Sequence, residues 1–79
     1  MRRVVDGIVL RETETREADK ILTVLTRTEG KIAVVARGAR RKNSRIAAAS
    51  QFLAYSEMTL FQKGNWSILD EANTLELFS

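Results

Sequence analysis

The segment from residue 52 to residue 61 restricts the fold more than any other, because apolar side chains fall on both faces of the strand that it predicts. Two sets alternate along it: Phe52, Ala54, Ser56, Met58 and Leu60 on one face, and Leu53, Tyr55, Glu57, Thr59 and Phe61 on the other. A strand in an open sheet with one solvated face would carry polar residues on that face. Two partly apolar faces are typical of a small closed barrel.

Three further segments predict strands: 4–10, 31–36 and 66–77. In the first, Gly7 indicates a bulge or a sharp bend, and a solvated stretch follows at 11–17. The second lies directly behind a predicted turn at Glu29-Gly30. The third is expected to break at Asp70-Glu71 and to resume at Leu75.

The run 18–28 is ambiguous between helix and strand. Ala18, Ile21, Leu22 and Leu25 recur at helical spacing. However, the run is rich in β-branched residues, and the turn after it leads straight into the next strand, which favours the first arm of a hairpin. The residues alone leave both structures open.

Residues 46–50 predict one or two helical turns, because three of the five are alanine, which loses no side-chain entropy in a helix. With 18–28 counted as a strand, the order is three strands, a short helix and two strands. The predicted fold class is therefore all-β: a five-stranded OB-fold barrel with a short helix between strands 3 and 4. At 79 residues the chain is long enough for one domain, 1–79.

The segment 37–45 carries five positive charges and no negative one, whereas the rest of the chain is slightly acidic. No acidic residue occurs from Lys31 to Ser56, so no carboxylate nearby in the sequence neutralises these charges. Such a cluster is typical of polyanion binding, since each neutralised phosphate releases condensed counterions. The candidate DNA-binding residues are Arg37, Arg40, Arg41, Lys42, Arg45, Lys31 and Ser44.

Two small residues of this segment also have a structural interpretation. Ser44 could donate to a phosphate, but it is at least as well placed to cap the helical turns that follow. Gly38 is expected to supply a positive φ or a close backbone approach at the end of the strand.

Aromatic residues are absent from 18–50, the region in which OB domains usually stack bases. The later aromatics Phe52, Tyr55, Phe61 and Trp66 are expected to fill the core of so small a domain. We therefore expect binding through phosphates, without sequence preference.

Catalytic chemistry has little support in the sequence. His and Cys are absent, which excludes the usual nucleophile pairs and imidazole or thiolate metal ligands. Acids such as Asp70-Glu71 could hold Mg²⁺ for a nuclease, but adjacent acids on a strand point to opposite faces. We expect no enzyme activity, cofactor or metal. No stretch is apolar enough to cross a bilayer and no signal peptide is present, so we expect a cytoplasmic location and no membrane partner.

Several motifs resemble the N-terminal domain of the bacterial RecO family of recombination mediators. They are Gly7–Arg11, Glu17–Thr26, Gly30–Ile32 and, above all, Val35–Arg45. The resemblance covers nearly the whole chain. It implies an OB-fold in which 18–28 is a strand, and a role in recombinational repair. That role comprises binding single-stranded DNA, annealing complementary strands and, with a RecR-type partner, helping a RecA-type recombinase to displace single-stranded DNA-binding protein.

The departures from the family also carry expectations. Members continue into a helical domain, frequently with a cysteine-ligated zinc site, so this chain is expected to be the N-terminal fragment of a longer protein. Contacts with single-stranded DNA-binding protein are expected in the missing part. Many members have proline where this chain has Gln51. Two questions stay open: whether double-stranded DNA also binds, and whether the chain is instead a protein-docking module for a RecR-like partner.

Overall fold

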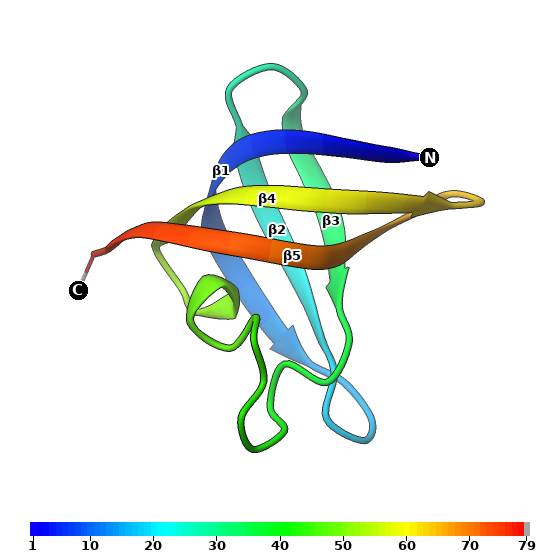
Figure 1. The fold of residues 1–79 in the computed structure, drawn as a ribbon, viewed down its shortest axis with the longest axis vertical. Coiled ribbons are helices and arrows are strands. Elements are labelled where there is room, and N and C mark those ends of the chain that lie inside the picture. Colours follow the sequence, from blue (N-terminus) through cyan, green and yellow to red (C-terminus); the bar gives the residue numbers. More distant parts are fainter. Residues whose placement is uncertain (79) are drawn as a thin grey trace.

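The computed structural model describes residues 1–78 and contains five strands and one short 3₁₀ turn (Figure 1). In chain order these are β1 (Arg2–Glu14), β2 (Lys20–Thr26), β3 (Gly30–Ala36), η1 (Ala48–Ser50), β4 (Ala54–Lys63) and β5 (Trp66–Leu77). The strands close into a barrel in the order β1-β2-β3-β5-β4, with β4 pairing back onto β1. The predicted all-β, OB-like barrel with a short helical element between strands 3 and 4 is confirmed.

The long strand β1 closes the barrel by pairing with two neighbours. Its first half pairs with β4, its second half pairs with β2, and Gly7 has partners on both sides. A Cβ at Gly7 would collide with Cγ1 of Val24, so this position needs glycine for close packing. The register of β1 against β2 shifts between Val9 and Arg11, so the irregularity lies there and not at Gly7, where a bulge or bend was predicted. The strand also continues to Glu14, through the stretch that was expected to follow it.

Residues 18–28 contain a strand, β2, which settles the ambiguity of the sequence. β2 and β3 form an antiparallel hairpin from Lys20↔Ala36 to Thr26↔Gly30. The Thr26 hydroxyl donates to the Gly30 carbonyl at 2.8 Å and accepts from the Glu29 N–H at 2.9 Å, which fixes the turn. As in any strand, residues three apart face opposite sides: Leu22 is buried, whereas Leu25 is 46% exposed.

The core lies inside the barrel and is lined by alternate residues of each strand. In β4 the inward set Ala54, Ser56, Met58 and Leu60 is fully buried. The outward residues of β4, which include both apolar and polar side chains, are partly exposed. The turn η1, predicted as one or two helical turns, buries Ala49 and Ser50, and the Ser50 hydroxyl donates to the Ile46 carbonyl at 2.7 Å.

β5 is continuous where a break was predicted. Around Asp70 its register against β4 shifts, from Leu60↔Leu69 to Thr59↔Glu71, so the acidic pair produces a bulge rather than an interruption.

Glu12 links three parts of the barrel and provides a pH-dependent test of the fold. One carboxylate oxygen accepts from the Lys20 ammonium and the other from the Phe52 N–H, both at 2.6 Å. The bond from Lys20, with a smaller contribution from Phe52, lowers the pKa of Glu12 from its ordinary value of 4.5. A carboxylate with a lowered pKa stabilises the fold above its unfolded-state pKa, and this contribution is lost as pH falls through the folded-state pKa.

We expect Glu12→Ala to lower the free energy of unfolding by about 1.5 to 3 kcal/mol at pH 7, the range for hydrogen bonds to charged groups. The difference from wild type should shrink as the pH falls below 4.5, toward the lowered pKa at which Glu12 itself becomes protonated in the folded protein. Urea unfolding at pH 7 and pH 3 measures both values. Glu76→Ala, on the exposed end of β5, is the control and should cost little. An unchanged difference at both pH values would contradict this role of Glu12.

Candidate nucleic-acid interface

The basic segment 37–45, here called the basic loop, follows β3 directly at the end of the barrel where β1 and β2 are also connected (Figure 1). It is folded into consecutive turns: Arg41 N–H donates to the Gly38 carbonyl at 3.0 Å and Ser44 N–H to the Arg41 carbonyl at 3.2 Å. Ala39 and Ile46 are buried in the barrel core. Hydrogen bonds and buried side chains therefore hold the backbone of the loop in place, while its charged side chains are exposed.

Gly38 and Asp19 fix the start of the basic loop. Gly38 has φ of +66°, a conformation that glycine adopts at no steric cost, and its N–H donates to Oδ1 of Asp19 at 2.7 Å. The expected backbone role of Gly38 is confirmed. The role of Asp19 was not predicted, because its bonding partner lies 19 residues away in the sequence.

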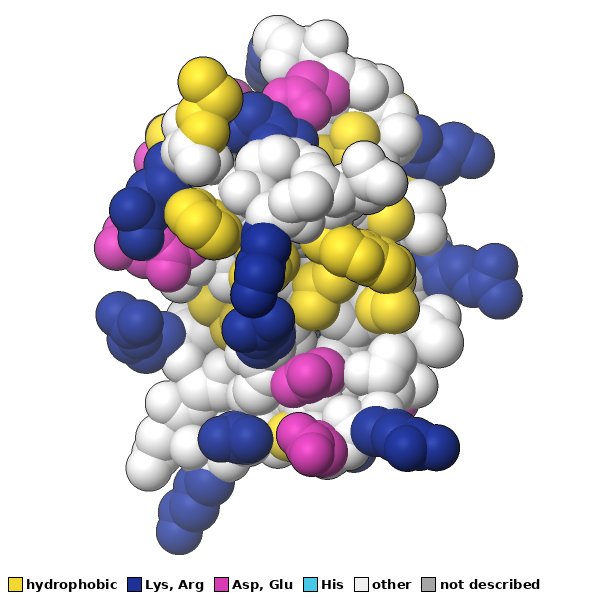
Figure 2. Space-filling view, turned by 90° about the vertical axis from the view of Figure 1, so that its right-hand side faces the viewer, with side chains coloured by type: hydrophobic (Ala, Val, Ile, Leu, Met, Phe, Trp, Pro, Cys, Tyr) yellow, Lys and Arg dark blue, Asp and Glu magenta, His cyan; other side chains and the backbone are white. Residues whose placement is uncertain are grey.

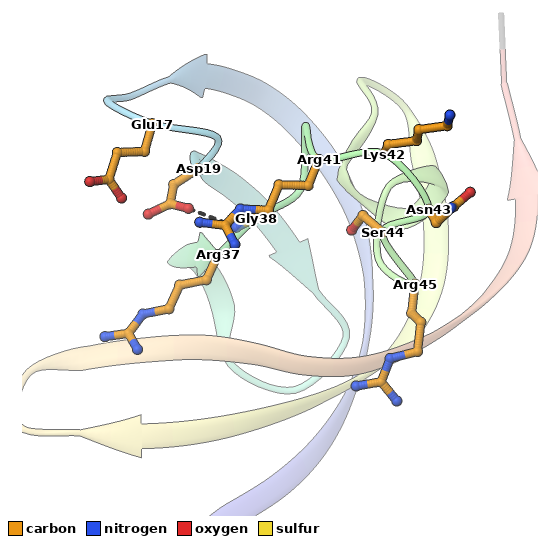
Figure 3. A pocket seen from close by; sticks show the side chains of 9 residues that line it. All are labelled: Glu17, Asp19, Arg37, Gly38, Arg41, Lys42, Asn43, Ser44 and Arg45. Atoms are coloured by element: carbon orange, nitrogen blue, oxygen red, sulfur yellow. Dashed lines mark hydrogen bonds between the residues drawn. The ribbon is translucent and has the colours of Figure 1, made fainter.

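An open hollow of about 840 Å³ lies on the basic loop (Figure 3). Four exposed cations line it, namely Arg37, Arg41, Lys42 and Arg45, together with Glu17 and Asp19. Within residues 1–78 none of these four cations forms an ion pair. In Figure 3 the Arg37 and Arg45 side chains extend on the same side of the loop, toward β5, whereas Lys42 points away. The hollow therefore offers four cations that form no ion pair, against the two carboxylates of Glu17 and Asp19.

Arg40, also a predicted site residue, is turned toward the protein. Its guanidinium donates to the carbonyl oxygens of Thr15 at 2.7 Å and Glu17 at 3.1 Å, and lies 3.7 Å from a carboxylate oxygen of Glu14. Glu17 has φ of +68°, which is uncommon for a residue with a side chain. Arg40 thus holds the connection between β1 and β2, and its charge is partly neutralised. The expectation that every basic-loop charge stays free does not hold for Arg40.

We expect Arg40→Gln to lower the free energy of unfolding by about 1 kcal/mol, as for typical lost hydrogen bonds. It should also speed amide hydrogen exchange in residues 15–19 by freeing the strained connection. Arg41→Gln is the matched control, because Arg41 is exposed and unpaired on the same loop. Equal exchange rates in the two variants would show that Arg40 does not hold this connection.

The two remaining predicted residues lie in different settings. Ser44 Oγ accepts from the Ile46 N–H at 3.3 Å in the turn before η1, but the N-cap of η1 is Ala47 and no side chain caps it, so the predicted cap at Ser44 is not formed. Lys31 is the second residue of β3 and lies at the opposite end of the barrel, next to the β2–β3 turn (Figure 1). Arg37 lies six positions further along the chain, which is roughly 20 Å at the usual rise of a strand. The structure therefore does not bring Lys31 to the basic loop.

The aromatic residues are not in the core, and the prediction that placed them there is wrong. Trp66 is 53% exposed, Phe52 and Phe61 are also exposed, and Tyr55 is half-buried. In β5 the inward positions belong to Ser67 and Leu69, so Trp66 faces outward. Ser67 can be buried because its hydroxyl donates to Gln62 at 3.0 Å and accepts from Arg3 at 3.2 Å.

The N-terminal arginines carry little free charge. Arg2 pairs with Asp70 at 2.8 Å. Arg3 binds both oxygens of Glu29, at 2.7 and 2.9 Å. This contact raises the pKa of the Arg3 guanidinium and lowers the pKa of the Glu29 carboxyl.

Asp70, considered above as a magnesium ligand, pairs with Arg2. Two further acids also have partners: Glu12 pairs with Lys20, and Asp19 accepts from the Gly38 N–H. Among residues 1–78, no three or more acidic side chains gather in a way that could hold a metal ion. In the same range there is also no helix with the length and apolarity needed to cross a membrane.

The fold and the basic loop together define a class of protein: a small OB-like barrel in which an ordered basic loop joins the third strand to the fourth. The profile of the family described as "Recombination protein O N terminal" matches residues 1–78, and the chain belongs to this family.

Similar proteins include three that are named DNA repair protein RecO. The one from Acetivibrio thermocellus is 40% identical over 72 residues, or 91% of this chain. Those from Symbiobacterium thermophilum and Listeria monocytogenes are 45% and 43% identical over 74 residues, or 94% of this chain. In each case the matched part is 29% of the relative, so the chain spans less than a third of these proteins.

Proposed function

We propose that this chain is the DNA-binding part of a recombinational DNA repair mediator and that its basic loop grips the phosphates of single-stranded DNA. One observation carries the proposal: Arg37, Arg41, Lys42 and Arg45 surround one open hollow, unpaired, on a loop that is pinned to the barrel. The names of the relatives place them in DNA repair. Phosphate binding by such a cluster is driven by counterion release and is independent of sequence.

The wider role follows from family membership and is likewise proposed. The protein would act in the cytoplasm as a binding protein rather than an enzyme, annealing complementary strands and helping to load a RecA-type recombinase with a RecR-type partner. Single-stranded DNA-binding protein would be contacted by parts of the longer relatives that lie outside this chain. Double-stranded DNA is a second possible ligand, since its phosphates carry the same charge.

Fluorescence anisotropy of a labelled oligo-dT tests the proposal. Arg41→Gln/Arg45→Gln removes two charges from the basic loop. Arg27→Gln/Lys31→Gln removes two exposed charges at the opposite end of the barrel and is the matched control. We expect the loop variant to bind more weakly than the control. Equal binding by both variants would refute the basic loop as the site.

A protein-docking role is the second candidate, and exposed apolar side chains favour it. Phe52, Leu75, Leu77 and Phe78 are each more than half exposed, and the backbone N–H of Phe78 bonds the carbonyl of Leu53 beside Phe52. Exposed apolar side chains that cluster in this way often mark protein contacts. Leu75→Ser/Leu77→Ser should then weaken binding to a RecR-type partner while leaving oligo-dT affinity unchanged.

A further inference from the structure

Next to the basic loop, an open groove of about 510 Å³ crosses the outer face of the barrel. Its floor is apolar, because Val35 of β3 lies beside Ile68 of β5 in parallel register. Trp66, two residues before Ile68 on the same face of β5, stands at its side. Figure 2 looks onto the side of the molecule that carries the β4–β5 hairpin and shows hydrophobic side chains with Lys and Arg beside them and Asp and Glu below.

The indole of Trp66 is the ring best placed to receive a ligand. It is 53% exposed. The neighbouring Phe61 ring is already occupied, because the Arg2 guanidinium lies 5.6 Å from its centroid and is held there by Asp70. Phe52 and Phe78 belong to the apolar cluster at the far end of β5.

Two cations flank the groove. Arg37 lines both the groove and the hollow of the basic loop, so the two form one continuous surface. Lys63 pairs in register with Trp66 across the β4–β5 hairpin and lies at the other side. A flat apolar ring between two cations matches a nucleotide, whose base has a π-face and whose phosphates are anionic.

We propose that Trp66 is a base-stacking platform, so that the groove holds one unpaired base while Arg37 and Lys63 contact the adjoining phosphates. This deepens the proposed function and rests on it. Bases inside a duplex are already stacked on each other and cannot lie on the indole. The site therefore gives the chain a preference for single strands, which phosphate contacts alone would not supply.

Trp66 is the single tryptophan of the chain, so its fluorescence reports on this site alone. The test uses oligo-dT and an abasic oligonucleotide of the same length, which keeps the phosphates but has no bases. We expect oligo-dT to quench Trp66 with the same midpoint as the anisotropy change. The abasic strand should bind more weakly and leave the emission nearly unchanged.

Variants then separate stacking from folding. Trp66→Ala should weaken oligo-dT binding about 5- to 150-fold, the loss expected for one stacked base, and Trp66→Phe should recover part of it. Affinity for the abasic strand should be the same in Trp66→Ala as in wild type. Leu75→Ala is the matched control, since Leu75 is equally exposed, at 53%, on the same strand.

The possible failures are distinguishable. If oligo-dT binds while Trp66 emission and Trp66→Ala affinity stay unchanged, the stacking platform is refuted and phosphate binding stands. If Leu75→Ala weakens binding as much as Trp66→Ala, the assignment to Trp66 is also refuted. If neither strand binds, the platform and the proposed function fail together.

Discussion

Changing Arg37, Arg41, Lys42 and Arg45 together to Gln is expected to abolish most of the salt dependence of oligonucleotide binding. Four phosphate contacts at about 0.7 each contribute about −2.8 to the slope of log K against log[salt], and the contact proposed for Lys63 adds about −0.7. The variant should keep only the small slope that comes from Lys63. If the counterion contribution vanishes near 1 M salt, its loss at 50 mM weakens binding by about 4 × 10³-fold. Anisotropy titrations of a labelled oligo-dT at several salt concentrations measure both quantities.

The fold of this variant should remain intact, because all four side chains are exposed and unpaired. The buried anchors Ala39 and Ile46, and the bond from Gly38 to Asp19, are unchanged. Circular dichroism and urea unfolding check this. A folded variant that keeps the wild-type slope would show that the phosphates are bound elsewhere.

The largest expected effect on stability is that of Leu22→Ala, which should lower the free energy of unfolding by about 2 to 5 kcal/mol. Leu22 is completely buried in the barrel core, so its truncation removes apolar contacts and leaves a cavity. In a domain of this size such a loss is a large part of the total stability. Urea unfolding followed by circular dichroism measures it.

Leu25→Ala is the matched control for Leu22→Ala. Leu25 lies on the same strand, but it points outward and is 46% exposed, so its truncation should cost under about 1 kcal/mol. A helix over 18–28 would instead place both leucines on one face and make both substitutions costly. Similar losses in the two variants would contradict the strand and the inward direction of Leu22.

Much of the barrel follows from local sequence. Alternation from residue 54 to residue 60 defines the inward face of β4, and Glu29-Gly30 defines the hairpin turn. For residues 18–28, by contrast, helical spacing and β-branched composition disagree. There the structure depends on hydrogen bonding to two neighbouring strands, which a single segment does not reveal.

The site was less predictable than the fold, because the contacts that decide it are distant in the sequence. The basic loop was apparent from charge alone. Arg40 could not be separated from Arg41, however, since its partners Thr15 and Glu17 lie 25 and 23 residues away. Trp66 was misplaced for a similar reason: Ser67 takes the inward position only because Gln62 and Arg3 satisfy its hydroxyl.

Mapping the amides that respond to single-stranded DNA tests the central claim most directly. In ¹H–¹⁵N correlation spectra of the chain titrated with oligo-dT, we expect the largest shifts in the basic loop, residues 37–45, and at Trp66. Arg27 and Lys31 at the other end of the barrel should change little. Shifts concentrated at residues 27–31, or at Leu75 and Leu77, with the basic loop unaffected, would contradict the account.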